Sequence, residues 1–204
     1  MSNIPEVPMP ERIAALERDA RGYPIPFTVM RDKDGQAVFT VNDSRQEKLC
    51  VENRLCHICG QALDAFPWFV GGPGSAYLNG KQGVYFNGSM HRDCLHYAME
   101  VCPHLAGKMT KSVAGPAVEK LHAQGVKTHD PTMLDGTPAV FVAVQATLFR
   151  AQRAFATPSY TYYVAKPFRR TEFWQGGHML AEHEGRSIVK EALKGIKERL
   201  AVPV

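Results

Sequence analysis

The sequence predicts an α+β fold, because helical and strand patterns follow one another along its 204 residues. Residues 137–149 and 159–166 are dense in Val, Phe, Tyr and Thr, which favour strands. Residues 187–200 place apolar side chains about one helical turn apart, which indicates an amphipathic helix. Residues 27–41 have apolar, β-branched arms around a charged turn that ends in Asp34-Gly35. That pattern predicts a β-hairpin.

Shorter elements complete the N-terminal part. Residues 11–22 predict a helix that ends at Gly22. The prolines in residues 23–27 then require an extended chain, because each proline disfavours helix in the residue before it. Asp43 or Ser44 can cap the helix that follows.

The middle of the chain alternates between turn-rich and helical segments. Residues 71–89, which include the motif GGPGS, are rich in glycine and predict loops, with short strands at 68–70 and 84–86. Helical spacing returns in residues 90–102. Another helix is predicted over 116–124, with proline in its first turn and glycine after its end.

Composition places the chain among soluble globular proteins, with 45% hydrophobic and 22% charged residues. No run of eighteen apolar residues occurs, so no membrane span is expected. The first residues carry glutamates and prolines instead of a basic start and an apolar block. This favours the cytoplasm over secretion. Five cysteines are an odd number, and thiols in a reducing compartment are better explained by metal binding than by disulfides.

Charge is distributed unevenly along the chain. Residues 1–104 carry 10 Lys/Arg and 12 Asp/Glu, a net charge of −2, whereas residues 105–204 carry 14 and 8, a net charge of +6. A basic half is compatible with an anionic partner such as nucleic acid, and equally with a solvated surface.

Two matched pairs of metal-ligand residues stand in the sequence. Cys56-x2-Cys59 is followed, after 31 intervening residues, by His91-x2-Cys94. Zinc prefers four tetrahedral ligands drawn from thiolate and imidazole, and these residues form a Cys3His set. A tight turn helped by Gly60 presents the first two thiolates. The first turn of a helix presents the second pair, because residues three apart face the same way.

A knuckle, a hairpin and a helix that carries the second ligand pair are the parts of a treble clef. The sequence therefore predicts a treble-clef-like zinc site embedded in a mixed α/β domain. Four protein ligands leave no open position for water, so the zinc is expected to be structural. A redox-active CxxC and a set of unliganded buried thiols are the alternatives. Cys50 and Cys102 fall outside the paired spacing; Cys102 is expected to be a packed thiol, and Cys50 could replace a ligand.

Motifs for zinc enzymes are missing around these residues. No HxE motif of the zinc deaminases and no HExxH motif of the metalloproteases occurs. The His/Asn/His site of an HNH nuclease is not apparent either. GGPGS lacks the Lys-Ser/Thr of a phosphate-binding loop, and His57, inside the knuckle, is expected to point to solvent.

Two further groups of residues could form sites. Near the start of the last helix lie four polar residues, His178, Glu182, His183 and Glu184. They could form a small polar site, or they could simply be a solvated helix end. Aromatic residues interleaved with cations resemble a stacking and charge surface for single-stranded nucleic acid, although alternation along a strand would bury half of the rings. The candidate nucleic-acid-binding residues are Tyr160, Tyr162, Lys166, Arg169 and Arg170.

Three regions follow from these patterns. Residues 1–54 hold the N-terminal hairpin and short helices, and residues 55–104 form the treble-clef-like zinc module. Residues 105–204 form a basic α+β part, which we expect to pack with the rest as one unit.

Several motifs together resemble a family of uncharacterised zinc-binding proteins encoded by bacteriophages and prophages. The matching strings are LCHICGQ, HRDCLHYAMEVCPHL, RGYPIPF and FWQGGHMLAEHEGRSIV. Their counterparts in the family are an LCxxCG knuckle, an HxxCxxYxxxxCP helix, an RGYPxP opening and a WxxGxxxxxxE segment. The matching residues run from Arg21 to Ile188, with few in the middle third. The resemblance implies a zinc-binding phage accessory protein in the host cytoplasm and supplies no reaction.

Three functional hypotheses remain at this point. In the first, a non-catalytic zinc-binding phage accessory protein binds nucleic acid or a host protein. In the second, a nuclease or nucleotide-modifying enzyme uses the zinc as a scaffold and has a separate active site. In the third, the chain is a structural or virion-associated module. The sequence does not determine the oligomeric state.

Overall fold

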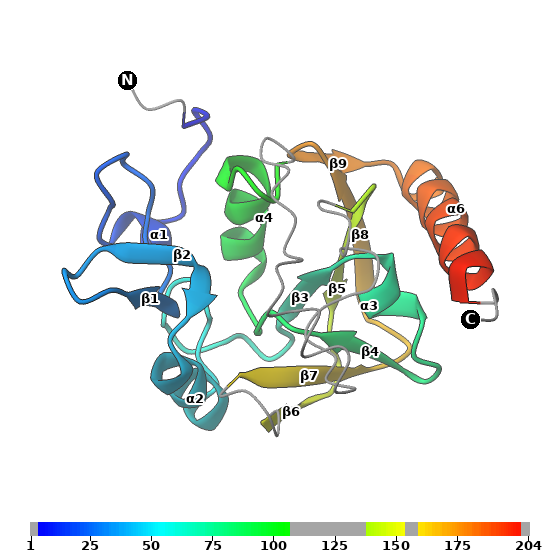
Figure 1. Cartoon of the computed structure of the whole chain (residues 1–204), viewed down its shortest axis with the longest axis horizontal. Helices are drawn as coiled ribbons and strands as arrows, with labels where there is room; N and C mark the ends of the chain where they lie inside the picture. The colour runs from blue at the N-terminus through cyan, green and yellow to red at the C-terminus, as the bar shows by residue number, and fades with distance from the viewer. Residues whose placement is uncertain (1–3, 107–137, 154–158, 201–204) are drawn as a thin grey trace.

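The computed structural model describes residues 4–106, 138–153 and 159–200, and its elements combine helices with antiparallel sheets (Figure 1). The predicted α+β class is confirmed. In chain order the elements are α1 (Glu11–Ala14), β1 (Val29–Arg31), β2 (Ala37–Asn42), α2 (Ser44–Asn53), β3 (Trp68–Gly71), α3 (Pro73–Tyr77), β4 (Gln82–Tyr85), α4 (Arg92–Val101), β5 (Phe141–Gln145), β6 (Phe149–Arg153), β7 (Tyr160–Ala165), β8 (Arg170–Gln175), β9 (His178–Leu180) and α6 (Glu182–Leu200).

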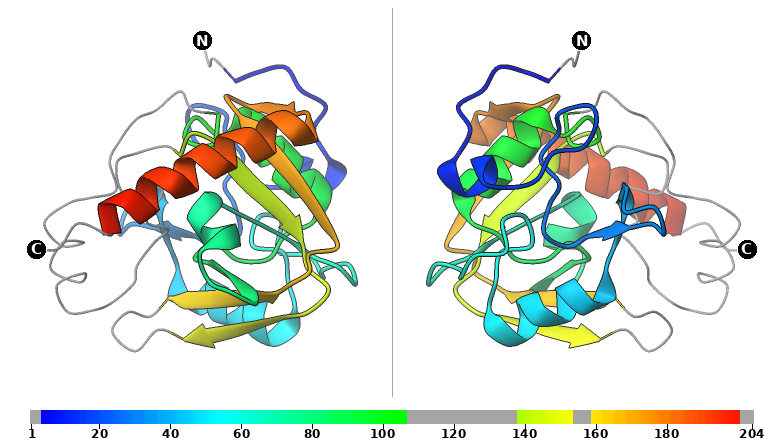
Figure 2. Two further views of the ribbon diagram at one scale, coloured as in Figure 1. Left: turned by 90° about the vertical axis from the view of Figure 1, so that its right-hand side faces the viewer. Right: turned by 90° about the vertical axis from the view of Figure 1, so that its left-hand side faces the viewer.

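The described strands form three antiparallel sheets. One is the β1–β2 hairpin, one has the order β3-β5-β8-β9, and one has the order β4-β7-β6. Neighbouring residues of β8 point to opposite faces of the four-stranded sheet: the Trp174 ring contacts His96 of α4, whereas Phe173 lies against Gly185 of α6. The views in Figure 2 agree, with α4 on one face of this sheet and α6 on the other.

Strand β3 divides the buried side chains between two cores. Trp68 and Val70 enter the first core, which also contains the candidate ligands Cys56, Cys59 and Cys94 and other residues of α4. Phe69, between them, enters the second core together with Tyr85 and Tyr162 of the three-stranded sheet. Both faces of the four-stranded sheet are therefore covered at its centre. This explains why residues 140–144 read as an unbroken apolar run.

Most of the short N-terminal elements form as predicted. The hairpin is present as β1 and β2, and Asp43 caps α2 by accepting a hydrogen bond from the Arg45 backbone N–H at 2.8 Å. Helix α1 ends at Ala14, well before Gly22. The Asp19 carboxylate accepts hydrogen bonds from backbone N–H groups farther along the chain and holds a turn there, which competes with helix.

Farther along, several boundaries differ from the predictions. The strand predicted over 137–149 is shorter: β5 ends at Gln145, and Phe149 already begins β6, which belongs to a different sheet. GGPGS is not a loop alone, because Pro73 begins the short buried helix α3. Helix α6 begins at Glu182, five residues before the predicted start, and the Glu184 carboxylate accepts a hydrogen bond from the Ala181 N–H. The helix predicted over 116–124 lies outside the described residues.

None of the described helices is both long enough and apolar enough to cross a bilayer.

Candidate metal centre

The first two ligands lie on a tight knuckle. The Cys56 N–H donates to the Gln61 carbonyl and the Gly60 N–H donates to the Cys56 carbonyl, both at 2.8 Å. Gly60 has a φ of +72°, and a Cβ on it would lie 2.7 Å from the Phe27 ring. Glycine is therefore required here both by the backbone conformation and by the packing.

Backbone hydrogen bonds fix this knuckle from two directions. On one side, the Phe27 N–H donates to the Ile58 carbonyl at 2.8 Å. On the other, the His57 N–H donates to the Ser89 carbonyl at 3.0 Å. The knuckle thus joins the segment before β1 to the segment that leads into α4.

The second pair of ligands lies at the start of α4. His91 occupies the N-cap position and Cys94 lies in the first turn, so both side chains project from the same end of the helix. The His91 carbonyl accepts the Leu95 N–H at 3.0 Å, which is the first hydrogen bond of the helix and agrees with the N-cap position of His91.

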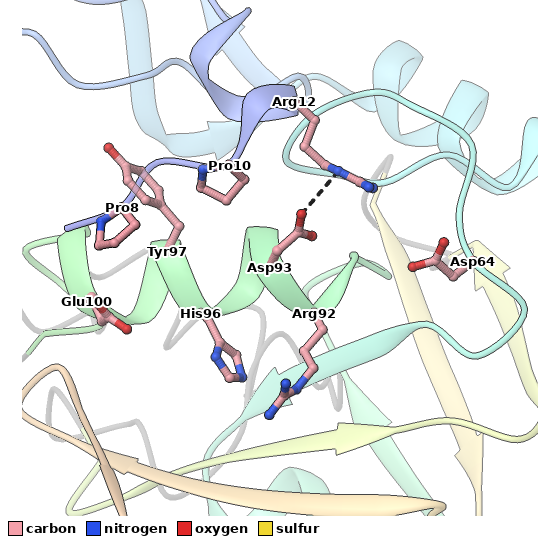
Figure 3. Close-up of a pocket in the computed structure, with 9 residues that line it drawn as sticks. All are labelled: Pro8, Pro10, Arg12, Asp64, Arg92, Asp93, His96, Tyr97 and Glu100. Carbon is pink, nitrogen blue, oxygen red and sulfur yellow. Dashed lines mark ion pairs between the residues drawn. The ribbon is translucent and has the colours of Figure 1, made fainter.

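Ion pairs hold the start of α4 on both sides, and Figure 3 shows the one with α1. Asp93 pairs with Arg12 of α1 at 3.2 Å. Arg92 and His96 project away from α1, and Glu172 of β8 accepts from them at 2.8 and 2.7 Å. Glu172 therefore fixes α4 to the four-stranded sheet, a role that the sequence did not predict.

The four candidate ligands converge on one point. Their ligand atoms lie within 4.8 Å of one another, and all four residues are buried. His91 Nδ1 is 3.4 Å from Cys59 Sγ and 3.9 Å from Cys94 Sγ. A tetrahedral zinc ion with ordinary bond lengths separates its nitrogen and sulfur ligands by about 3.6 Å. The group therefore has the composition and the spacing of a metal site.

Hydrogen bonding fixes which nitrogen of His91 faces the sulfurs. Nε2 lies 2.8 Å from the Ala62 carbonyl oxygen, which can only accept, so Nε2 carries the proton. Nδ1 then presents its lone pair to the sulfurs, as a metal ligand must.

The protonation of the thiols also suits a cation. Hydrogen bonds from Cys59 and Cys94 lower the pKa of Cys56, whereas hydrogen bonding to Cys56 and Cys59 raises the pKa of Cys94. Without a cation, three adjacent thiols cannot all ionise, because each thiolate charge repels the next. A divalent cation would displace the shared protons and bind the set as thiolates.

The other two cysteines lie outside this group. Cys50 is buried, and burial raises the pKa of its thiol to about 12. Cys102 is half-buried at the C-terminal end of α4. Neither belongs to the set of converging ligand atoms.

The segment between the ligand pairs is not a simple hairpin. Strand β3 pairs with β5 and β4 pairs with β7, so the two strands belong to different sheets with α3 between them. A knuckle and a helix carry the two ligand pairs, but the hairpin predicted between them does not form, because β3 and β4 pair with other strands. The reason is long-range: each strand finds its partner in the C-terminal half.

His57 is buried, so the prediction that it points to solvent is wrong. Its Nε2 lies 3.0 Å from the Tyr162 hydroxyl oxygen, and only 5% of the residue is exposed. Burial lowers the pKa of His57 to about 4. A neutral imidazole thus links the knuckle to β7 inside the protein.

The candidate nucleic-acid-binding residues do not form one surface. Tyr162 is fully buried, so its ring cannot stack on a base, and this part of the prediction is wrong. Tyr160 is half-buried at the start of β7. Lys166, the residue after the end of β7, is also half-buried and donates a hydrogen bond to the Gly80 carbonyl. Arg169 and Arg170 are exposed and line a separate hollow.

The polar residues near the start of α6 are exposed, and the two glutamates have local partners. Glu182 pairs with Arg186 at 2.7 Å, Glu184 caps the helix, and His178 and His183 face solvent. Within the described residues, the Cys3His set is the only group of side chains positioned to hold a metal ion.

No protein-family model, no curated protein and no solved structure matches the chain. The candidate site therefore stands on its own geometry.

The packing of His57 gives a test of the knuckle. A Cβ on Gly88 would overlap the His57 ring, so Gly88→Ala is expected to lower the free energy of unfolding by about 1–3 kcal/mol. Gly195→Ala in α6 is the matched control, because a Cβ there meets nothing within 4 Å. The control should be neutral or gain up to about 1 kcal/mol. Urea unfolding of both variants measures the difference, and equal stabilities would contradict the packing.

Glu172 gives a test of how α4 is fixed to the sheet. Burial raises the pKa of Glu172, but hydrogen bonds and charges from His96 and Arg92 outweigh it and hold the pKa below its usual 4.5. Because the folded pKa is the lower one, the carboxylate stabilises the fold above pH 4.5, and this is lost as the pH falls through the folded pKa. Glu172→Gln should therefore cost about 1–2 kcal/mol at pH 7.

Urea titrations of the wild type and Glu172→Gln over a series of pH values measure this difference. The gap should close as the pH falls below 4.5. A gap that stays constant with pH would show that the charge of Glu172 contributes nothing.

Proposed function

We propose that this chain is a non-catalytic zinc-binding protein in which the ion is structural. The observation that carries the proposal is the convergence of three buried thiols and one buried imidazole nitrogen within 4.8 Å. Four protein ligands complete a tetrahedral shell and leave no position for water or substrate. The Nε2–H···O contact from His91 to Ala62 supplies the outer-shell support typical of zinc-bound histidines.

Zinc in this site would act as a crosslink. Cys56 and Cys59 are joined through the knuckle to the residues before β1, and His91 and Cys94 are joined through α4 to β8. Binding all four residues would therefore connect the N-terminal hairpin, α4 and the four-stranded sheet. We describe the site as treble-clef-like in its two ligand-bearing parts, with β3, α3 and β4 in place of the hairpin.

We propose further that the protein belongs to the phage accessory class and acts in the host cytoplasm by binding nucleic acid. The motifs from Arg21 to Ile188 support the class, and the net charge of +6 on residues 105–204 supports the anionic partner. A host protein is the second candidate partner. Phe39 and Val41, on one face of β2, are 40% and 42% exposed and could contact it.

Metal analysis and a binding assay test these proposals together. Elemental analysis of purified protein should find one zinc ion per chain, and a second divalent metal would favour the enzyme hypothesis instead. Binding of an oligonucleotide that weakens steeply with salt would support the nucleic-acid partner. Binding to neither nucleic acid nor a host protein, together with a stable oligomer, would favour the structural or virion-associated module.

A further inference from the structure

A hollow rich in arginine is lined in part by Arg92, the residue that follows the candidate ligand His91. It has a volume of about 530 Å³, and four arginines and two glutamates line it, for a formal charge of +2. The arginines come from α4, from the start of β8 and the residue before it, and from α6; they are Arg92, Arg169, Arg170 and Arg186. The arginines therefore come together from separate elements, whereas the charged residues on one face of a single helix would be neighbours in any case.

Two of the four arginines are already neutralised. Arg92 pairs with Glu172 at 2.8 Å and Arg186 pairs with Glu182 at 2.7 Å. Arg169 and Arg170 form no ion pair with any residue that the structure describes. The excess positive charge of the hollow is therefore concentrated on these two neighbouring side chains.

Contacts of its own hold Arg169 in place. Its guanidinium lies over the Phe66 ring, 4.1 Å from the centroid, and its backbone N–H donates to the Gln145 carbonyl at 2.9 Å. Stacking uses the face of a guanidinium and leaves the N–H groups at its edge for a ligand. The fork is thus oriented before any ligand arrives, which lowers the entropy cost of binding.

The hollow lies where the edge strand of the sheet ends. Strand β9 pairs with only the last three residues of β8, from Phe173 to Gln175. Arg170 to Glu172 pair with β5 on one side, and no strand among the described residues pairs with them on the other. The short edge strand therefore leaves a notch at the start of β8, between α4 and the beginning of α6.

Apolar side chains also line the notch. Met179 is 55% exposed and Phe168 is half-buried, and both line the same hollow as the arginines. A ligand with both a phosphate and a planar base would use the two kinds of contact together. Arginine forks match phosphate oxygens in pairs, and apolar or aromatic surfaces accept the faces of bases.

We propose that this hollow binds a backbone phosphate of single-stranded nucleic acid, with Arg169 and Arg170 as the main contacts. The inference rests on the nucleic-acid part of the proposed function and names its site. It replaces the surface along residues 160–170 that the sequence suggested, because only the two arginines of that set line the hollow.

Fluorescence anisotropy with a labelled oligothymidine about 12 nucleotides long tests the site on the full zinc-loaded chain. The double variant Arg169→Ala/Arg170→Ala should bind about tenfold or more weakly at about 50 mM salt. The slope of log K for binding against log salt concentration should also be shallower by about 1.4, which is the contribution of two phosphate contacts on a single strand. Both side chains are exposed, so zinc content should be unchanged, and loss of the Arg169–Phe66 contact should cost no more than about 1 kcal/mol of stability.

The matched control is Arg150→Ala/Arg153→Ala, which removes the same charge from exposed positions on β6. Its affinity should stay within about twofold of the wild type; an equal loss in both double variants would assign the effect to net charge and overturn the site. Unchanged binding by Arg169→Ala/Arg170→Ala would overturn the hollow alone. No binding by the wild type would overturn the nucleic-acid partner as well.

Competition separates the polymer from a lone phosphate group. Unlabelled oligothymidine should displace the labelled probe, whereas inorganic phosphate and adenosine monophosphate at the same phosphate concentration should not. Displacement by inorganic phosphate would overturn the assignment to a nucleic-acid strand.

Discussion

Cys59→Ser is expected to release the zinc ion that we propose for the Cys3His site and to unfold at least residues 55–104. A serine hydroxyl is a poor zinc ligand, so the variant retains three ligands, and the buried charges of the remaining thiolates lose their cation. Structural zinc contributes on the order of 10 kcal/mol of binding free energy in small fingers. Because the Phe27 N–H bonds to the Ile58 carbonyl, the hairpin should loosen as well. Elemental analysis and thermal unfolding followed by circular dichroism measure both effects, and Cys94→Ser should behave alike.

Cys102→Ser is the matched control for this prediction. The Cys102 side chain is half-buried and does not belong to the converging ligand set. That variant should keep one zinc ion per chain and lose little stability. A Cys59→Ser chain that keeps both its metal and its melting curve would refute the metal centre.

The ligand set could be predicted because its signal is local. Each pair is three residues apart, and a turn or a helix start brings such residues together without help from the rest of the chain. The partners that support the site are different in kind. His91 bonds to a carbonyl 29 residues away, His57 to a hydroxyl 105 residues away, and His96 to a carboxylate 76 residues away. No spacing in the sequence marks these pairs, because they exist only once the sheets have formed.

Strand β7 shows why the sequence could not predict which of its aromatic residues are buried. Alternation with a period of two predicts that half of its side chains are buried, but it does not say which half. Pairing with β4 sets the answer: Tyr85 lies opposite Tyr162, and both are fully buried in the second core. Tyr163, next in sequence, lies on the other face beneath the Arg150 guanidinium. The choice depends on long-range strand pairing and not on composition.

Strand β3 separates the core that contains the candidate metal ligands from the second core. Successive residues of a strand point to opposite faces, so Trp68 and Val70 pack beside the cysteines while Phe69 packs away from them. The two cores share a backbone but not their side chains. A substitution in one core can therefore be separated experimentally from a substitution in the other.

Phe69→Ala should lower the free energy of unfolding by about 3–5 kcal/mol while the zinc content stays at one ion per chain. The ring is fully buried, and its centroid lies 5.7 Å from that of Tyr85, 5.1 Å from Phe149 and 5.8 Å from Tyr162. These three rings belong to the three-stranded sheet, whereas Phe69 belongs to the four-stranded sheet. Removing the ring leaves a cavity at the contact between the two sheets. Urea unfolding with zinc analysis of the same samples measures the effect.

Leu148→Ala is the control for an apolar truncation, because Leu148 is 70% exposed and its removal opens no cavity. Its cost should be within about 0.5 kcal/mol of zero. Zinc loss from Phe69→Ala in the folded state would contradict the separation of the two cores, since the metal would then depend on packing that faces away from it. A cost as small as that of Leu148→Ala would show instead that the aromatic contacts do not hold the two sheets together.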